Sequence, residues 1–238
     1  KFPKFKTNDV YSVVSNLRSP DGFTRHFAKR HLRQINKNQA IEALEKLEQK
    51  KGISDEDKLE ILWSHQAINN LNEELLKNLL DSVDHKIRAA AVRVLYHWHQ
   101  KVKQPLNFLA DAINDAHPRV RLEAISTLRN IGNGEAFNLI MDAFDYEIDS
   151  NIDFALWLAA KEMKSVWLPL LQKGMIDIKG RHTALQFILK ASEEKEALSL
   201  LAKSLSSAEL KGVGFRELSS LYADLGKPED LDILYGAA

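Results

Sequence analysis

The side chains best suited to chemistry in this chain of 238 residues are its eight histidines and a set of recurring arginines. The histidines lack the spacing of a metal site: His97 and His99 lie two residues apart and would diverge on a helix, and no His-Glu-x-x-His motif occurs. The chain contains no cysteine, which excludes disulfides, thiolate ligands and a haem attached through Cys-x-x-Cys-His within it. We therefore expect no metal site and no cofactor.

Motifs of catalysis and phosphate binding are missing as well. The sequence has no Gly-x-Ser-x-Gly elbow, no Walker loop and no dinucleotide fingerprint, and Gly212-Val213-Gly214 is too short to form one. The tryptophans lie at helical spacings among aliphatic residues, so we interpret them as packing residues. They are Trp63, Trp98, Trp157 and Trp167. These patterns predict that the chain is not an enzyme by itself.

The arginines occupy a repeated frame, in which an apolar residue or Thr precedes Arg, Ala follows three residues later and Leu seven later. The clear copies are Thr24-Arg25…Ala28…Leu32, Ile87-Arg88…Ala91…Leu95 and Val120-Arg121…Ala124…Leu128. Each follows a polar loop containing an aspartate. Phosphate binding is one interpretation, but the spacing follows the repeat, so we favour ion pairs and hydrogen bonds to the loops.

The frames must be carried by a stack of helix pairs. We call the Arg position of each copy its anchor. Weaker copies with anchors at Glu60, Asp153, Arg181 and Arg216 give a period of about 32 residues, which is typical of a solenoid. Amphipathic runs precede the anchors, and no segment alternates with a period of two. The first helix of each pair is expected to contain residues 10–17, 40–47, 73–83, 106–113, 135–144, 166–171 or 194–205, and the second helix begins at the anchor. We predict an all-α solenoid of about six to seven helix pairs, forming one right-handed superhelical array over residues 1–238.

The run His117-Pro118-Arg119-Val120-Arg121-Leu122-Glu123-Ala124, between paired helices, resembles the HEAT repeat. Segments 19–25, 117–131, 153–157 and 167–169 further resemble the HEAT region of bacterial multidomain haem-binding proteins. Those proteins join a dehydrogenase-like propeller, helical repeats and a cytochrome c domain. The resemblance implies a periplasmic or other extracytoplasmic location, and redox chemistry that lies outside this chain. The sequence begins without Met and ends within an expected helix, so we interpret it as a fragment of a larger protein.

These observations favour a non-catalytic scaffold or docking module for a neighbouring domain or another protein. Basic and acidic residues both number 33, and this balance argues against a nucleic-acid partner. The alternative is a nucleic-acid-contacting repeat related to HEAT-like DNA glycosylases. A HEAT-like lyase is a third class, but no acid–base constellation supports it. No apolar run reaches the ~18–20 residues that span a bilayer. The oligomeric state is left open.

One row of side chains is expected on the concave face of the second helices. Counted from the residue before each anchor, position six is Arg30, His65 and Arg93 in the first three repeats, and His97 lies one turn beyond Arg93. Stacked repeats bring equal positions into register. We predict that these four residues form a polar strip suited to an acidic loop of a neighbouring domain. The alternative is an ordinary solvated helix face.

Overall fold

The computed structural model of the chain describes residues 9–173, 175–176 and 181–192. All regular structure in these ranges is helical, which confirms the all-α prediction there. The α-helices are α1 (Val10–Ser15), α2 (Gly22–Leu32), α3 (Lys37–Glu48), α4 (Asp55–Ala67), α5 (Glu73–Leu80), α6 (His85–Trp98), α7 (Pro105–Ile113), α8 (Pro118–Ile131), α9 (Gly134–Met141), α10 (Ser150–Glu162), α11 (Lys164–Gln172) and α12 (His182–Ser192). Two 3₁₀ turns, η1 (Asn16–Arg18) and η2 (Asp142–Asp145), extend α1 and α9. None of the described helices has the length and apolar character of a membrane span.

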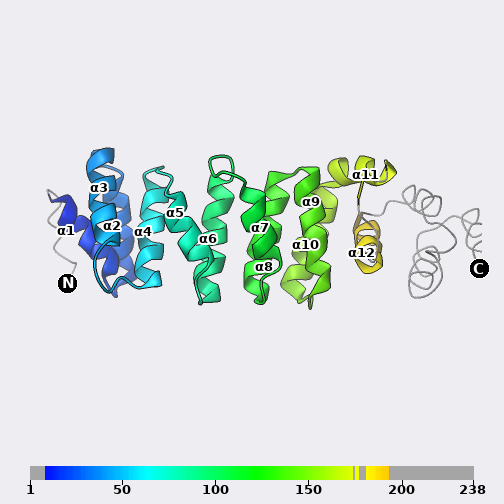
Figure 1. The fold of residues 1–238 in the computed structure, drawn as a ribbon, viewed down its shortest axis with the longest axis horizontal. Coiled ribbons are helices and arrows are strands. Elements are labelled where there is room, and N and C mark those ends of the chain that lie inside the picture. The colour runs from blue at the N-terminus through cyan, green and yellow to red at the C-terminus, as the bar shows by residue number, and fades with distance from the viewer. Residues whose placement is uncertain (1–8, 174, 177–180, 193–238) are drawn as a thin grey trace, which may run out of the picture. The chain divides into compact units, whose positions relative to one another are not determined.

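The described residues divide into two compact units, a first that ends at Phe108 and a second that begins at Leu109. In the first unit the second helices of successive pairs, α2, α4 and α6, pack side by side, and α1 packs on α3 (Figure 1). In the second unit α8, α10 and α12 are neighbours in the same way, and α9 packs on α11. This is the packing of an α-solenoid, in which each pair contacts the next. The expected repeat at Arg216 and the helix within 194–205 lie outside the described residues. One continuous, right-handed array stays a prediction.

The starts of the second helices are fixed by polar caps. Asp21 Oδ2 accepts a hydrogen bond of 2.8 Å from the backbone N–H of Thr24, and Asp84 Oδ1 accepts one of 2.8 Å from that of Lys86. A capping side chain satisfies an N–H group that has no partner inside the helix. The cap therefore provides a reference from which equivalent positions of these helices can be counted.

The frame alanines mark the buried side of these helices. Ala28, Ala91 and Ala124 are 0% exposed, as the repeat pattern predicts. A larger side chain at such a position would overpack the core. We expect Ala91→Leu to lower the free energy of unfolding by about 1–3 kcal/mol, measured by urea denaturation. Ala90→Leu, at a half-exposed position one residue earlier, is the control and should change it by less than about 0.5 kcal/mol. Equal effects of the two substitutions would contradict the burial of Ala91 in the core.

Candidate interaction surface

The recurring arginines hold the loops that precede their own helices. In each case Nη1 of the guanidinium donates two hydrogen bonds, to the backbone carbonyls six and five residues earlier. The pairs are Arg25 to Ser19 (2.7 Å) and Pro20 (3.1 Å), Arg88 to Ser82 (2.8 Å) and Val83 (3.0 Å), and Arg121 to Asp115 (2.9 Å) and Ala116 (3.1 Å). These hydrogen bonds confirm the expectation that the recurring arginines bind the loops before their helices.

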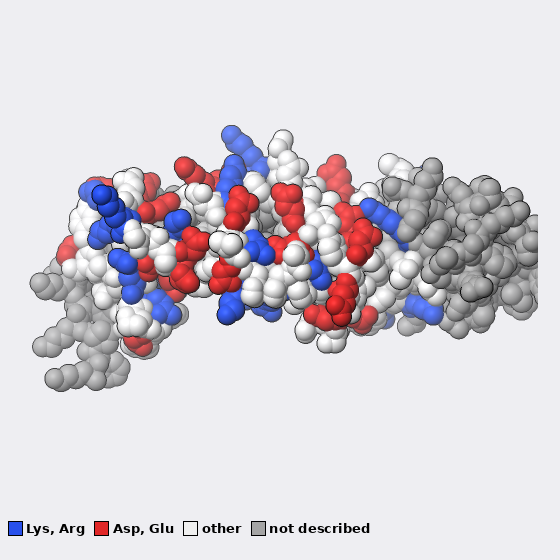
Figure 2. Space-filling model, turned by 60° about the horizontal axis from the view of Figure 1, so that its bottom comes forward, with Lys and Arg blue, Asp and Glu red and all other residues white. Residues whose placement is uncertain are grey.

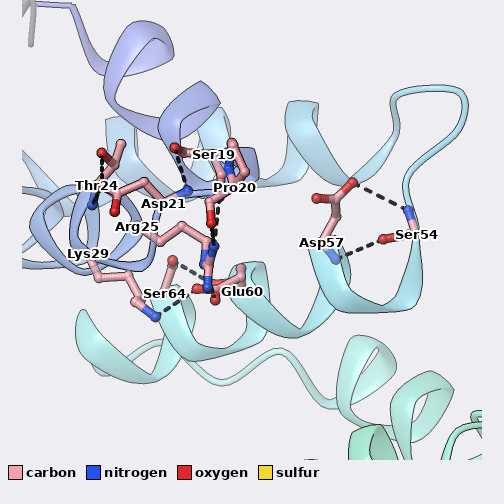
Figure 3. A network of polar contacts seen from close by, with 10 residues as sticks. All are labelled: Ser19, Pro20, Asp21, Thr24, Arg25, Lys29, Ser54, Asp57, Glu60 and Ser64. Carbon is pink, nitrogen blue, oxygen red and sulfur yellow. Dashed lines mark hydrogen bonds and ion pairs between the residues drawn. The ribbon is translucent and has the colours of Figure 1, made fainter. Parts of the chain in front are cut away.

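Arg25 also reaches the next repeat. Its Nε lies 2.9 Å from Oε1 of Glu60 on α4, and the Lys29 ammonium lies 2.7 Å from Oε2 of the same carboxylate (Figure 3). Asp21 is not the ion-pair partner: its carboxylate caps α2 at Thr24, and those hydrogen bonds lower the pKa of Asp21. Glu60 is only 9% exposed, so one shielded carboxylate neutralises two cations from α2.

The structure corrects the prediction for His65, which is 0% exposed and therefore cannot belong to a surface strip. Its Nδ1 lies 3.0 Å from Nδ2 of Asn70, and its Nε2 lies 3.5 Å from Nδ2 of Asn72. Burial disfavours the charged ring and lowers the pKa of His65 to about 4. His65 is thus a neutral interior residue of the first unit.

The error has a simple origin in the phase of α4. Arg30 and Arg93 each lie nine residues after their N-caps, Asp21 and Asp84. The N-cap of α4 is Ser54, whose Oγ accepts from the N–H of Asp57 while the Asp57 carboxylate accepts from the N–H of Ser54 (Figure 3). Nine residues after Ser54 comes Trp63. Using Glu60 as the anchor shifted the count by two residues, or about 200° around the helix. Counting from the Ser54-x-x-Asp57 capping box would have identified the right residue.

The corrected row therefore reads Arg30, Trp63 and Arg93 along α2, α4 and α6. Arg30, Arg93 and His97 are exposed, and Trp63 is half-buried. The sequence thus placed three of its four candidates on the surface, whereas their role in binding stays a prediction. The Lys29 ammonium lies 4.9 Å from the centre of the Trp63 ring, an arrangement that attracts the cation to the aromatic face.

A groove of about 630 Å³ runs between α2 and α4. Its lining residues are His26, Lys29, Arg30, Arg33, Trp63, Gln66 and Ala67. None of them is acidic. Among the described residues Arg30 and Arg33 form no ion pair, whereas Lys29 is held by Glu60. On the face drawn in Figure 2, by contrast, acidic and basic side chains are interspersed, in line with a formal net charge of zero. The groove is a local concentration of cations beside an aromatic ring.

The other tryptophans divide into two classes. Trp98 and Trp167 are buried, as expected, and Trp167 Nε1 donates 2.8 Å to the carbonyl of Ala160. Trp157 is 38% exposed on α10, with its ring stacked on that of Phe154 at 5.8 Å. The interpretation of all four as packing residues was therefore wrong for Trp157 and incomplete for Trp63. The apolar spacing alone did not distinguish the outer face of a helix from its inner one.

The described residues contain no group of three or more His, Asp or Glu side chains arranged to hold a metal ion. Residues 72–158, from the start of α5 into α10, match the family model for HEAT repeats. A comparison with curated proteins finds no significant match. The helix pairs of this stretch are thus similar to HEAT repeats. The groove, formed by residues 26–67, lies in helix pairs that precede the matched stretch.

Proposed function

We propose that this chain is a non-catalytic helical-repeat scaffold that docks a neighbouring domain or another protein. The observation that carries the proposal is the row of solvent-facing side chains on adjacent second helices, Arg30, Trp63 and Arg93, with the cationic groove at its start. Stacked repeats bind through extended surfaces on which a few anchor side chains dominate the affinity, and Trp and Arg are the commonest anchors.

The partner we favour is a domain of the same polypeptide. This rests on the resemblance of several segments to the HEAT region of multidomain haem-binding proteins, where helical repeats lie between a propeller and a cytochrome domain. In such a protein the repeats would hold the two domains in position, and any redox reaction would take place outside this chain. An extracytoplasmic location follows from the same resemblance.

The test is quantitative co-purification from extracts of the source cells. The tagged 238-residue chain is compared with Arg30→Ala combined with Arg93→Ala, and bound proteins are measured by mass spectrometry. We expect a protein that carries the partner domain, either the longer polypeptide itself or another protein, to be lost with the double variant. Lys50→Ala with Lys51→Ala, at exposed positions after α3, is the matched control and should retain it. Identical binding by all three proteins would contradict docking through this row.

A further inference from the structure

We infer that the groove between α2 and α4 binds an acidic linear segment of the partner protein. This inference rests on the proposed docking function and specifies the chemistry of what is docked. Three observations carry it: the extent of the basic row on α2, the ion pairing of each cation in it, and the aromatic ring that α4 contributes to the lining.

The basic side chains follow one stripe of α2. His26, Lys29, Arg30 and Arg33 are spaced at intervals of three, one and three residues, which places them on a single helix face. From 26 to 33 the stripe extends about 10 Å, at a rise of about 1.5 Å per residue. About three residues of extended peptide cover that distance. The spacing therefore fits two or three successive acidic side chains of an extended segment.

The cations are not equivalent. Glu60 takes up the charge of Lys29 and of Arg25, which lies outside the groove lining. Arg30 and Arg33 are exposed and form no ion pair with a described carboxylate. A guanidinium donates two parallel N–H hydrogen bonds to a carboxylate, so these two arginines are the groups that bind the incoming acidic side chains. The peptide then needs no rearrangement of the Arg25–Glu60–Lys29 network.

The α4 side of the groove is partly apolar, with Gln66 as its polar residue. Trp63 contributes a half-buried ring and Ala67 a methyl group, one turn further along α4. Lys29 covers part of this ring. A segment that carries only charge would leave the exposed part of the ring uncovered, whereas an apolar side chain beside the acidic residues would cover it. We therefore expect the bound segment to contain Asp or Glu next to a large apolar residue.

A phosphate or nucleic-acid ligand fits the groove less well. No Ser, Thr or Gly lines it, so the hydroxyl and close backbone N–H donors that cradle a phosphate are missing from the lining. A nucleic-acid strand needs a longer track of cations and several stacking rings. The groove offers one ring and a stripe of about 10 Å.

The experiment is fluorescence polarisation with the 238-residue chain at 150 mM salt. The probes are a labelled decapeptide with five Glu and one Leu, the same peptide with Gln in place of Glu, and a ten-nucleotide thymidine strand. We expect the Glu peptide to bind at least tenfold more tightly than the other two. Arg30→Glu with Arg33→Glu should weaken it at least tenfold. Lys50→Glu with Lys51→Glu makes the same change in charge and should weaken it less than twofold.

Equal weakening by both charge-reversal pairs would overturn the inference, because attraction would then be general. Tighter binding of the thymidine strand would overturn it in favour of nucleic acid. Arg30→Gln with Arg33→Gln provides a milder variant if charge reversal disturbs folding, as judged by circular dichroism. If the Glu peptide does not bind but Arg30→Ala with Arg93→Ala still removes a co-purifying protein, the ligand class is wrong and docking stands. If co-purification is also unchanged, docking itself fails.

Discussion

His65 is expected to cost the first unit about 3 kcal/mol of stability as the pH falls from 7 to 4, because in the folded state this residue stays largely neutral above pH 4. The pKa of His65 is about 4 when buried, against 6.5 for an ordinary histidine. Above pH 6.5 both states are neutral at this residue. Below it the unfolded state binds the proton and the folded state does not, so stability falls until pH 4. One pKa unit corresponds to about 1.4 kcal/mol, which gives the stated loss.

Urea denaturation at a series of pH values measures this effect, with His65→Gln as the comparison. The variant removes the titrating group, so its stability should fall by about 2–3 kcal/mol less over the same pH range, whatever its stability at pH 7. Glu48 contacts Asn72 in the same cluster, and burial raises its pKa, which acts in the opposite direction and is retained in both proteins. Parallel pH profiles would show that His65 is not buried as described.

Replacing Glu60 by Gln is expected to lower the free energy of unfolding by roughly 2 kcal/mol. The substitution keeps the shape of the side chain but leaves Arg25 and Lys29, both partly buried, without their shared carboxylate. It should also strengthen binding of an acidic peptide, because Lys29 is then released to the ligand. If Glu60 had a purely structural role, replacing it would not raise the affinity for the acidic peptide.

Glu56→Gln is the matched control, since Glu56 is exposed one turn earlier on α4. It should alter stability by less than about 0.5 kcal/mol. Urea denaturation and peptide titration are carried out on both variants. If Glu60→Gln is as stable as Glu56→Gln, the ion pairs of the first two repeats contribute little. If Glu60→Gln is less stable but binds the peptide no more tightly, the released Lys29 does not contribute to peptide binding.

The fold was largely predictable because the repeat pattern constrains it at many positions together. The Arg–Ala–Leu frame identified α2, α6 and α8, and the alanines proved fully buried. The amphipathic runs located the first helices, although their ends differed: the run expected over 73–83 ends as α5 at Leu80. That difference reflects the turn that delivers Asp84 to the N-cap of α6, which periodicity alone does not report.

The site was less predictable because a surface row depends on an accurate helical phase. An error of two residues in α4 replaced Trp63, which lines the groove, by His65, which is buried. Counting from the cap at Ser54, and not from the weak anchor at Glu60, gives the correct phase. The pairing of Arg25 and Lys29 with Glu60 joins residues more than 30 positions apart. Such a contact follows from the packing of α2 on α4, which a single sequence does not specify in detail.

The most direct test of the account is ¹⁹F NMR of the chain labelled with 5-fluorotryptophan. Its four reporters lie in distinct places: Trp63 in the groove, Trp98 and Trp167 buried, and Trp157 exposed on α10. Each signal is assigned with a Trp→Phe variant. On addition of the Glu peptide we predict that the Trp63 signal shifts and saturates with the dissociation constant found by polarisation, while the other three stay in place. A shift of Trp157 instead, or no shift of Trp63 while the peptide is bound, would contradict a docking surface between α2 and α4.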